Sequence, residues 1–162
     1  MKSTVYIETS IISYLTARSS NDIRQAARRN STIEWWEKSS RNFDVFVSEY
    51  VLIEAARGNP KAAEKRLNAI ATIPILETTR LVRKVAESLL NFGALPRQAE
   101  LDAHHIAIAT AHGMEYLLTW NCRHIANAVM RPKIEIICLQ AKCEPPVICT
   151  PDELMPDESM QE

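Results

Sequence analysis

Glycine is scarce in this chain, which has 3 glycines among 162 residues, against about 7% in average proteins. No window of the sequence holds two glycines close enough together to form a glycine-rich phosphate loop of either common pattern. Nucleotide binding through such a loop is therefore excluded.

Neither sign of charge is in excess, because 19 Lys and Arg residues are balanced by 20 Asp and Glu residues, for a net charge of -1. Such a chain has no global basic field that would attract nucleic acid by charge alone. Any contact with nucleic acid must therefore come from a local patch of basic residues.

Long hydrophobic runs are also missing. No segment approaches the roughly 18 consecutive apolar residues of a membrane helix, and residues 1–10 are typical of a strand rather than of a charged and then apolar leader. We therefore expect a cytoplasmic protein that has no contact with membranes.

The cysteines match no zinc motif. All of them lie in the last quarter of the chain, at Cys122, Cys138, Cys143 and Cys149, and their spacings fit neither a CxxC pattern nor a zinc ribbon. We expect reduced thiols that are mostly buried.

The sequence does contain a regular alternation of short β-branched runs with longer helical patterns, which is typical of a parallel sheet covered by helices. The predicted strands are residues 4–7, 45–47, 73–76, 116–119 and 147–149. The predicted helices are residues 11–16, 22–38, 49–57, 60–71, 79–91, 99–112 and 122–141. We expect one α/β domain over residues 1–150.

Residues 151–162 form the predicted C-terminal segment. Thr150, Pro151 and Glu153 match a capping box, with a threonine before the helix, a proline at its first position and a glutamate at its third. We expect a short helix there, followed by a frayed tail over residues 157–162. No internal repeat or linker indicates a second domain.

Four polar residues are predicted to meet at the carboxyl edge of the sheet, where parallel α/β proteins carry their chemistry near the reversal of strand order. Glu8 and Asn121 follow predicted strands, whereas Glu54 and Asp102 lie in helices that flank strand ends. Each acid also has a purely structural explanation. Glu8 would cap a helix, Asp102 would interact with a helix dipole, and Glu54 would lie on a solvated face.

The three carboxylates indicate a cation when they are taken as a set. Carboxylates that share a small site repel one another and raise each other's pKa, unless a bound cation compensates their charge. A set of oxygen ligands favours Mg²⁺ or Mn²⁺ over zinc. Glu8, Glu54 and Asp102 therefore indicate a divalent-metal site.

The order and spacing of several motifs resemble those of the PIN-domain family, and within it the VapC-type toxins of bacterial toxin–antitoxin systems. The motifs cover nearly the whole chain and comprise residues 5–10 with 13–15, residues 47–48 with Glu54, Asp102 with 105–109, and residues 117–121 with 124–125. The resemblance implies a three-layer α/β/α sandwich around a parallel sheet of about five strands. It also implies a metal-dependent ribonuclease site built from acidic side chains.

Position by position, Glu8, Glu54 and Asp102 resemble the three family acids, and Asn121 falls where many members have a fourth acid. The resemblance implies that Glu8 and Asp102 are the main ligands of Mg²⁺ or Mn²⁺. Glu54 would act through water or a second ion, and Asn121 would orient water. The cation would activate water for hydrolysis of an RNA phosphodiester.

Further residues are expected around the acids. Thr9 or Ser10 resembles the small hydroxyl residue that supports the first acid, and His105 is expected to donate a hydrogen bond near the acids. A zinc site on the helical face of Asp102, His105 and His112 is the weaker alternative, because no closed set of Cys and His ligands is visible.

Basic residues are candidates for contacts with RNA. Arg123 and His124 follow Asn121 closely, although a capping or core role is the alternative for His124. Other candidates for the RNA backbone are Arg18, Arg24, Arg28, Arg29 and Arg131, with a solvated surface as their default. Trp35 and Trp36 indicate either a partner groove or an ordinary amphipathic helix, with one ring in the core and the other partly exposed.

Two positions depart from the family pattern. Glu8 stands where the usual residue is Asp, and its extra methylene moves the carboxylate outward by roughly one bond length, which matters to a Mg²⁺ that requires near-octahedral geometry. Asn121 offers a carbonyl oxygen without a negative charge. We therefore expect weaker metal binding than the family pattern would provide.

The favoured function is a metal-dependent endoribonuclease toxin, which the resemblance pairs with a small antitoxin protein and with a homodimer. The second hypothesis is a PIN-fold oligomeric binding module that has lost most of its catalysis. The third is a nuclease that acts on structured DNA with the same site chemistry.

Overall fold

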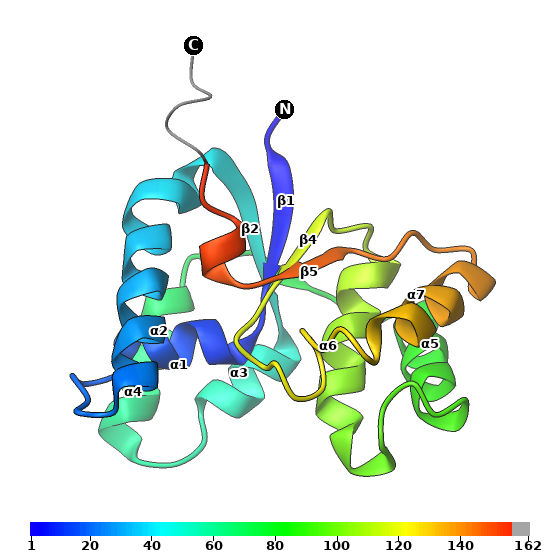
Figure 1. The fold of residues 1–162 in the computed structure, drawn as a ribbon, viewed down its shortest axis with the longest axis horizontal. Coiled ribbons are helices and arrows are strands. Elements are labelled where there is room, and N and C mark those ends of the chain that lie inside the picture. The colour runs from blue at the N-terminus through cyan, green and yellow to red at the C-terminus, as the bar shows by residue number, and fades with distance from the viewer. Residues whose placement is uncertain (157–162) are drawn as a thin grey trace.

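A computed structural model describes residues 1–156, which contain a five-stranded sheet in the order β3-β2-β1-β4-β5 (Figure 1). All four strand pairs are parallel. The strands are β1 (Ser3–Ile7), β2 (Phe43–Ser48), β3 (Ile75–Leu76), β4 (Tyr116–Leu118) and β5 (Val147–Cys149). The predicted α/β class with a parallel sheet is confirmed.

Seven α-helices connect the strands within residues 1–156. They are α1 (Thr9–Thr16), α2 (Ile23–Glu34), α3 (Glu49–Ala55), α4 (Pro60–Ile70), α5 (Arg80–Asn91), α6 (Glu100–Ala111) and α7 (Arg131–Gln140). In Figure 1, α1, α2 and α4 lie together on one side of the sheet, and α5, α6 and α7 lie on the other. This is the expected three-layer sandwich. None of these helices is long and apolar enough to cross a membrane.

Shorter helical segments complete the chain. A π-helix (Trp35–Ser39) continues α2, and 3₁₀ turns cover Ser40–Asn42, Arg97–Ala99 and Pro151–Glu153. The last of these carries the predicted capping box, because Glu153 Oε2 accepts a hydrogen bond from the Thr150 amide at 2.8 Å. The predicted tail over residues 157–162 lies outside the described residues.

The core is centred on β1 and α6. Val5, Tyr6 and Ile7 are fully buried, because β1 has a strand on either side and helices on both faces. Ile106 and Ile108 of α6 are fully buried as well. Residues 106–109 of α6 are apolar on every side of the helix, and such a stretch must be surrounded by protein.

Strand order reverses between β1 and β4. From β1 the chain continues to β2 and β3 on one side of the sheet, whereas β4 leads to β5 on the other. The Glu8 amide donates to the Leu118 carbonyl at 3.0 Å, so the ends of β1 and β4 lie side by side. This edge is the switch point at which open α/β sheets bind their ligands.

The predicted helix over residues 122–141 is wrong in its first half, because residues 122–130 form turns and α7 begins only at Arg131. The Asn121 side chain accepts from the His124 amide, and the Asn127 side chain accepts from the Val129 amide, both at 3.0 Å. Asparagine side chains that bond to nearby amides compete with helical hydrogen bonds. Pro132 then lies in the first turn of α7, where a missing N–H is tolerated.

All four cysteines are free thiols, but only two of them are buried. Cys138 and Cys149 are buried, Cys143 is half-buried and Cys122 is exposed. Burial raises the pKa of the Cys149 thiol to about 12. The expectation of mostly buried thiols therefore fails at Cys122, which lies in the turn region after β4.

Both tryptophans of the adjacent pair lie in the π-helix after α2. Trp35 is fully buried and stacks on Phe43 with ring centroids 6.0 Å apart, whereas Trp36 is only partly buried. The prediction of one core ring and one partly exposed ring is confirmed.

Candidate functional site

Glu8 lies between β1 and α1, and the residue is only 4% exposed. Its backbone is at the N-cap of α1, but its side chain makes no capping hydrogen bond. Instead Oε2 accepts from Ser10 Oγ at 2.5 Å and from Thr119 Oγ1 at 2.7 Å. Oε1 accepts no hydrogen bond from residues 1–156. The capping explanation for this acid is therefore excluded.

The two hydroxyls that hold Glu8 are themselves held by the backbone after β4. Ser10 Oγ accepts from the Trp120 amide at 2.8 Å, and Thr119 Oγ1 accepts from the Asn121 amide at 2.9 Å. Each hydroxyl thus accepts one N–H and donates its own proton to the carboxylate. This arrangement locks the Glu8 side chain to the neighbouring strand.

Glu54 lies in the last turn of α3, with 23% of its side chain exposed. Its Oε1 accepts from Thr9 Oγ1 at 2.9 Å and pairs closely with His105 Nε2, whereas Oε2 has no hydrogen bond within the described part of the chain. Burial raises the pKa of Glu54, but the hydrogen bond and charge of His105 outweigh burial and leave the pKa below its usual value. Glu54 is therefore an ionised, positioned side chain rather than a solvated one.

His105 of α6 is fully buried behind the glutamates. Its Nδ1 lies 2.7 Å from Tyr6 Oη, which lies 2.7 Å from Ser48 Oγ. Burial lowers the pKa of His105, but the hydrogen bond to Glu54 and the charges of the nearby acids raise it above its usual value overall. Both ring nitrogens are engaged, Nε2 by Glu54 Oε1 and Nδ1 by Tyr6 Oη, so His105 orients the Glu54 carboxylate.

The phenol of Tyr6 stays neutral in this network. Burial is the main cause that raises its pKa well above the usual value, and the charges of Glu8 and Glu54 act in the same direction. The neutral Tyr6 hydroxyl therefore joins His105 Nδ1 to Ser48 Oγ through two hydrogen bonds of 2.7 Å each. The role of Tyr6 was missed at the level of sequence, although a tyrosine in an otherwise aliphatic buried strand needs a partner for its hydroxyl.

Glu8, Glu54 and His105 form a tight cluster, in which one ligand atom from each lies within 4.8 Å of the others. Glu8 Oε1 and Glu54 Oε2, which accept no hydrogen bond from the described part of the chain, belong to the residues of this cluster. Mg²⁺ and Mn²⁺ prefer oxygen ligands of this kind. The donor set therefore fits the expected cation, through the two glutamates.

Asp102, in the first turn of α6, contacts the loop after β4 instead. Its Oδ1 accepts from Asn121 Nδ2 at 3.0 Å, and its Oδ2 lies 2.8 Å from His124 Nδ1. Among residues 1–156 the third member of the tight cluster is His105, whereas Asp102 was expected. The role of Asp102 as a metal ligand stays a prediction.

The support residues divide between the two glutamates. Ser10 contacts Glu8, and Thr9 contacts Glu54. Thr119, a second donor to Glu8, was missed at the level of sequence. The sequence feature that could have indicated this role is the position of Thr119, a hydroxyl residue at the end of a predicted strand.

The remaining histidine candidate lies apart from this cluster. His112 Nε2 lies 2.7 Å from the Glu77 carbonyl, and no metal-ligand cluster of residues 1–156 includes His112. The structure therefore offers no support for the zinc alternative.

Several arginines are engaged in structural contacts. The Arg28 guanidinium lies 5.3 Å from the ring centroid of Trp120, Arg29 donates to the Ala17 carbonyl at 2.8 Å, and Arg131 donates to the Ile148 carbonyl at 3.4 Å. Arg123 is exposed. The contact of Arg123 and His124 with RNA stays a prediction.

No family model and no curated protein matches this sequence. Solved structures do match it. VapC20 of Mycobacterium tuberculosis, a toxin that cleaves the sarcin–ricin loop, aligns with a TM-score of 0.57 at 18% identity over 77% of this chain and 95% of its own. A chain of VapBC2 from Rickettsia felis, solved with a DNA fragment from their promoter, aligns with a TM-score of 0.58 at 13% identity over 91% and 98%. The chain therefore has the fold of the VapC-like PIN-domain toxins.

Proposed function

We propose that this chain is a Mg²⁺- or Mn²⁺-dependent endoribonuclease that acts as the toxin of a toxin–antitoxin pair. One observation carries the proposal: Glu8 and Glu54 lie in one cluster at the switch point of the sheet, and Glu8 Oε1 and Glu54 Oε2 accept no hydrogen bond from residues 1–156. RNA is favoured as the substrate class because VapC20, which shares the fold, cleaves the sarcin–ricin loop.

A bound divalent cation would lower the pKa of an attacking water and offset the charge that grows on the phosphate. Glu8 and Glu54 would hold it. Ser10 and Thr119 keep the Glu8 carboxylate oriented, and His105 does the same for Glu54. These donors leave one oxygen of each glutamate for the cation.

Asp102 and Asn121 would act from the other side of the site. The Asn121 amide is held by Asp102 and presents its carbonyl oxygen to the His124 amide. In the proposed mechanism this pair orients the loop and water beside the scissile phosphate. His124, which also contacts Asp102, would contact the RNA backbone together with Arg123.

The test is cleavage of a labelled structured RNA by purified protein in Mn²⁺. We expect EDTA to abolish cleavage and Glu8→Gln to slow it by at least about 100-fold, because the loss of a ligand should cost no less than the loss of a residue that only orients one. The matched control is Glu87→Gln, because Glu87 is an exposed glutamate of α5. Cleavage that persists in EDTA, or that proceeds at the wild-type rate in Glu8→Gln, would contradict the proposed site. The same assay on structured DNA tests the third hypothesis, which predicts cleavage of the DNA rather than of the RNA.

The proposal includes a small antitoxin protein as partner, a homodimer and a cytoplasmic location. The VapBC2 match supports an antitoxin partner. A short open reading frame for a DNA-binding antitoxin is expected beside this one, and co-expression of the two should restore the growth of a host that this chain inhibits. A chain that inhibits growth with no such neighbour would contradict the toxin–antitoxin assignment and leave the ribonuclease assay unaffected.

A second candidate function is the oligomeric binding module with little catalysis. It is favoured by the engagement of both Asp102 oxygens, by Asn121 and His124, which removes one of the three acids from the free ligand set. Calorimetry distinguishes the two: this candidate predicts RNA binding without Mn²⁺ binding, whereas the nuclease predicts both.

A further inference from the structure

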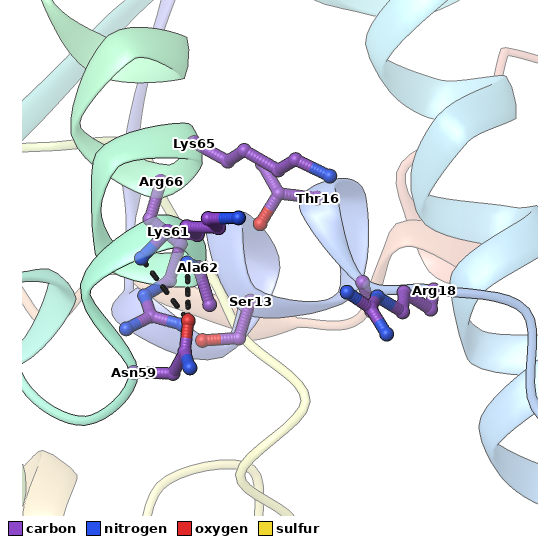
Figure 2. Close-up of a pocket in the computed structure, with 9 residues that line it drawn as sticks. Ser13, Thr16, Arg18, Asn59, Lys61, Ala62, Lys65 and Arg66 are labelled. Carbon is purple, nitrogen blue, oxygen red and sulfur yellow. Dashed lines mark hydrogen bonds between the residues drawn. The ribbon is translucent and has the colours of Figure 1, made fainter.

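A cavity of about 440 Å³ lies between the end of α1 and the beginning of α4, and among residues 1–156 its lining contains four cationic side chains and no carboxylate. Ser13, Thr16 and Arg18 come from α1 and the residues after it, and Lys61, Lys65 and Arg66 come from α4. Figure 2 shows Lys61 and Lys65 extending toward Thr16, with Arg18 to one side.

The cations around this cavity, which we call the basic cavity, are not all free. The Arg66 guanidinium donates to the carbonyls of Ala55 and Arg57, at 2.9 and 2.5 Å. Arg18, Lys61 and Lys65 form no hydrogen bond or ion pair through their side chains with any residue of the described chain. Three side-chain charges around the cavity are therefore available to an anion.

The N-terminus of α4 does not itself provide the anion site. The amides of Lys61 and Ala62 donate to Asn59 Oδ1 at 3.0 and 3.2 Å (Figure 2). The first helical amides are thus already capped. Any anion in the basic cavity would be held by lysine and arginine side chains and by the Ser13 hydroxyl.

The basic cavity lies at the far end of the helix that begins at the acid cluster. α1 starts at Thr9, next to Glu8, and ends at Thr16 in the cavity wall. At 1.5 Å per residue the helix is about 12 Å long. A nucleic-acid strand carries a phosphate at every nucleotide, so a strand with one phosphate at Glu8 reaches the cavity within a few nucleotides.

We propose that the basic cavity is a phosphate subsite, which holds the RNA backbone a few nucleotides from the bond to be cleaved. This inference rests on the proposed ribonuclease function and names a second contact region for its substrate. Within the described part of the chain, Ala17 and Ala62 are the only apolar residues that line the cavity. Lysines and hydroxyls without a large apolar side chain among them suit a phosphate backbone better than a folded peptide, which needs apolar anchors.

The experiment measures binding separately from cleavage. Fluorescence anisotropy with single-stranded RNA is recorded in EDTA, with gels to confirm that the RNA stays intact, for the wild-type chain and for Lys61→Gln/Lys65→Gln. The matched control is Lys84→Gln/Lys133→Gln, because both lysines are exposed on the opposite helical layer. We expect the first double variant to raise the Kd for RNA about tenfold. The slope of the logarithm of the binding constant against the logarithm of the salt concentration, the salt slope, should also decrease by about 0.7 for each phosphate that the chain no longer neutralises.

The outcomes distinguish this proposal from the proposed function. An unchanged Kd and salt slope, or an equal loss in the control, would overturn the subsite even if the wild-type chain cleaves RNA in Mn²⁺. Lysine-dependent binding by a chain that never cleaves RNA would support the subsite and contradict the nuclease. Poly-glutamate and polyuridylate are then compared as competitors. If poly-glutamate displaces the RNA as efficiently as polyuridylate does, the cavity binds an acidic peptide and the proposal is overturned.

Discussion

At the residue scale, the carboxylate of Glu8 is oriented by hydroxyls from two different elements, Ser10 of α1 and Thr119 at the end of β4. Glu8 has one more methylene than the aspartate that is usual at the matching family position. Two donors on Oε2 limit the conformations of this longer side chain. The extra length is therefore compensated by additional hydrogen bonding.

Thr119→Val tests this compensation, because valine keeps the volume and removes the donor to Glu8. Thr119 is fully buried, and the change also leaves the Asn121 amide without its acceptor. We expect a loss of 10- to 100-fold in Mn²⁺ affinity and of about 1–3 kcal/mol in the free energy of unfolding. Calorimetry and urea titration measure the two effects.

The control for this variant is Thr72→Val, which changes an exposed threonine. It should alter the free energy of unfolding by less than about 0.5 kcal/mol. An unchanged Mn²⁺ affinity in Thr119→Val would mean that the hydroxyl supports the fold and not the cation site.

At the scale of elements, α6 and the loop after β4 are joined by side chains rather than by backbone pairing. Asp102 in the first turn of α6 accepts from Asn121 and contacts His124. His105, one turn further along α6, reaches Glu54 of α3. The apolar helix thus carries two polar residues that connect it to both halves of the site.

Asn121→Asp reverses the electrostatics of this junction. The new carboxylate still accepts from the His124 amide, but it faces Asp102 as a like charge instead of donating to it. We expect about tenfold tighter Mn²⁺ binding, together with a loss of about 1 kcal/mol in the free energy of unfolding without metal. Isothermal calorimetry and urea unfolding in EDTA measure these opposite effects.

The isosteric control at the same junction is Asp102→Asn, which removes the acid and keeps the shape. It should weaken Mn²⁺ binding. Tighter binding in both variants would contradict a charge-based role for this pair.

At the scale of the whole molecule, the site joins elements that are far apart in sequence: the ends of β1 and β4, the end of α3 and the first turns of α6. A cation held by Glu8 and Glu54 would connect the end of β1 to α3, two elements that are far apart in the sequence. Whatever binds the folded chain and not the unfolded one must stabilise the fold as a whole.

Mn²⁺ should accordingly raise the free energy of unfolding by about 2.7 kcal/mol at a concentration 100 times its Kd. Urea unfolding with and without Mn²⁺ measures the increase, and EDTA should reverse it. Glu8→Gln should abolish the increase, whereas the exposed-site variant Glu87→Gln should retain it. An equal increase in Glu8→Gln would place the stabilising cation elsewhere.

The sequence by itself determined the fold class and the place of the acids along the chain. Alternation of β-branched runs with amphipathic segments is a local signal, and it located all five strands. The position of Glu8 immediately after β1 and of Asn121 shortly after β4 follows from the same local pattern. These features depend on neighbours in the sequence, so the sequence alone could predict them.

Only the tertiary structure decided which polar atoms meet. Thr119 reaches Glu8 across 111 residues, and His105 reaches Glu54 across 51. The turns over residues 122–130 were missed for a related reason: Asn121 is also bound by Asp102 from α6, and that hydrogen bond exists only in the folded chain. Hydrogen bonds over such separations depend on how helices pack against the sheet, and local residue patterns carry no information about that packing.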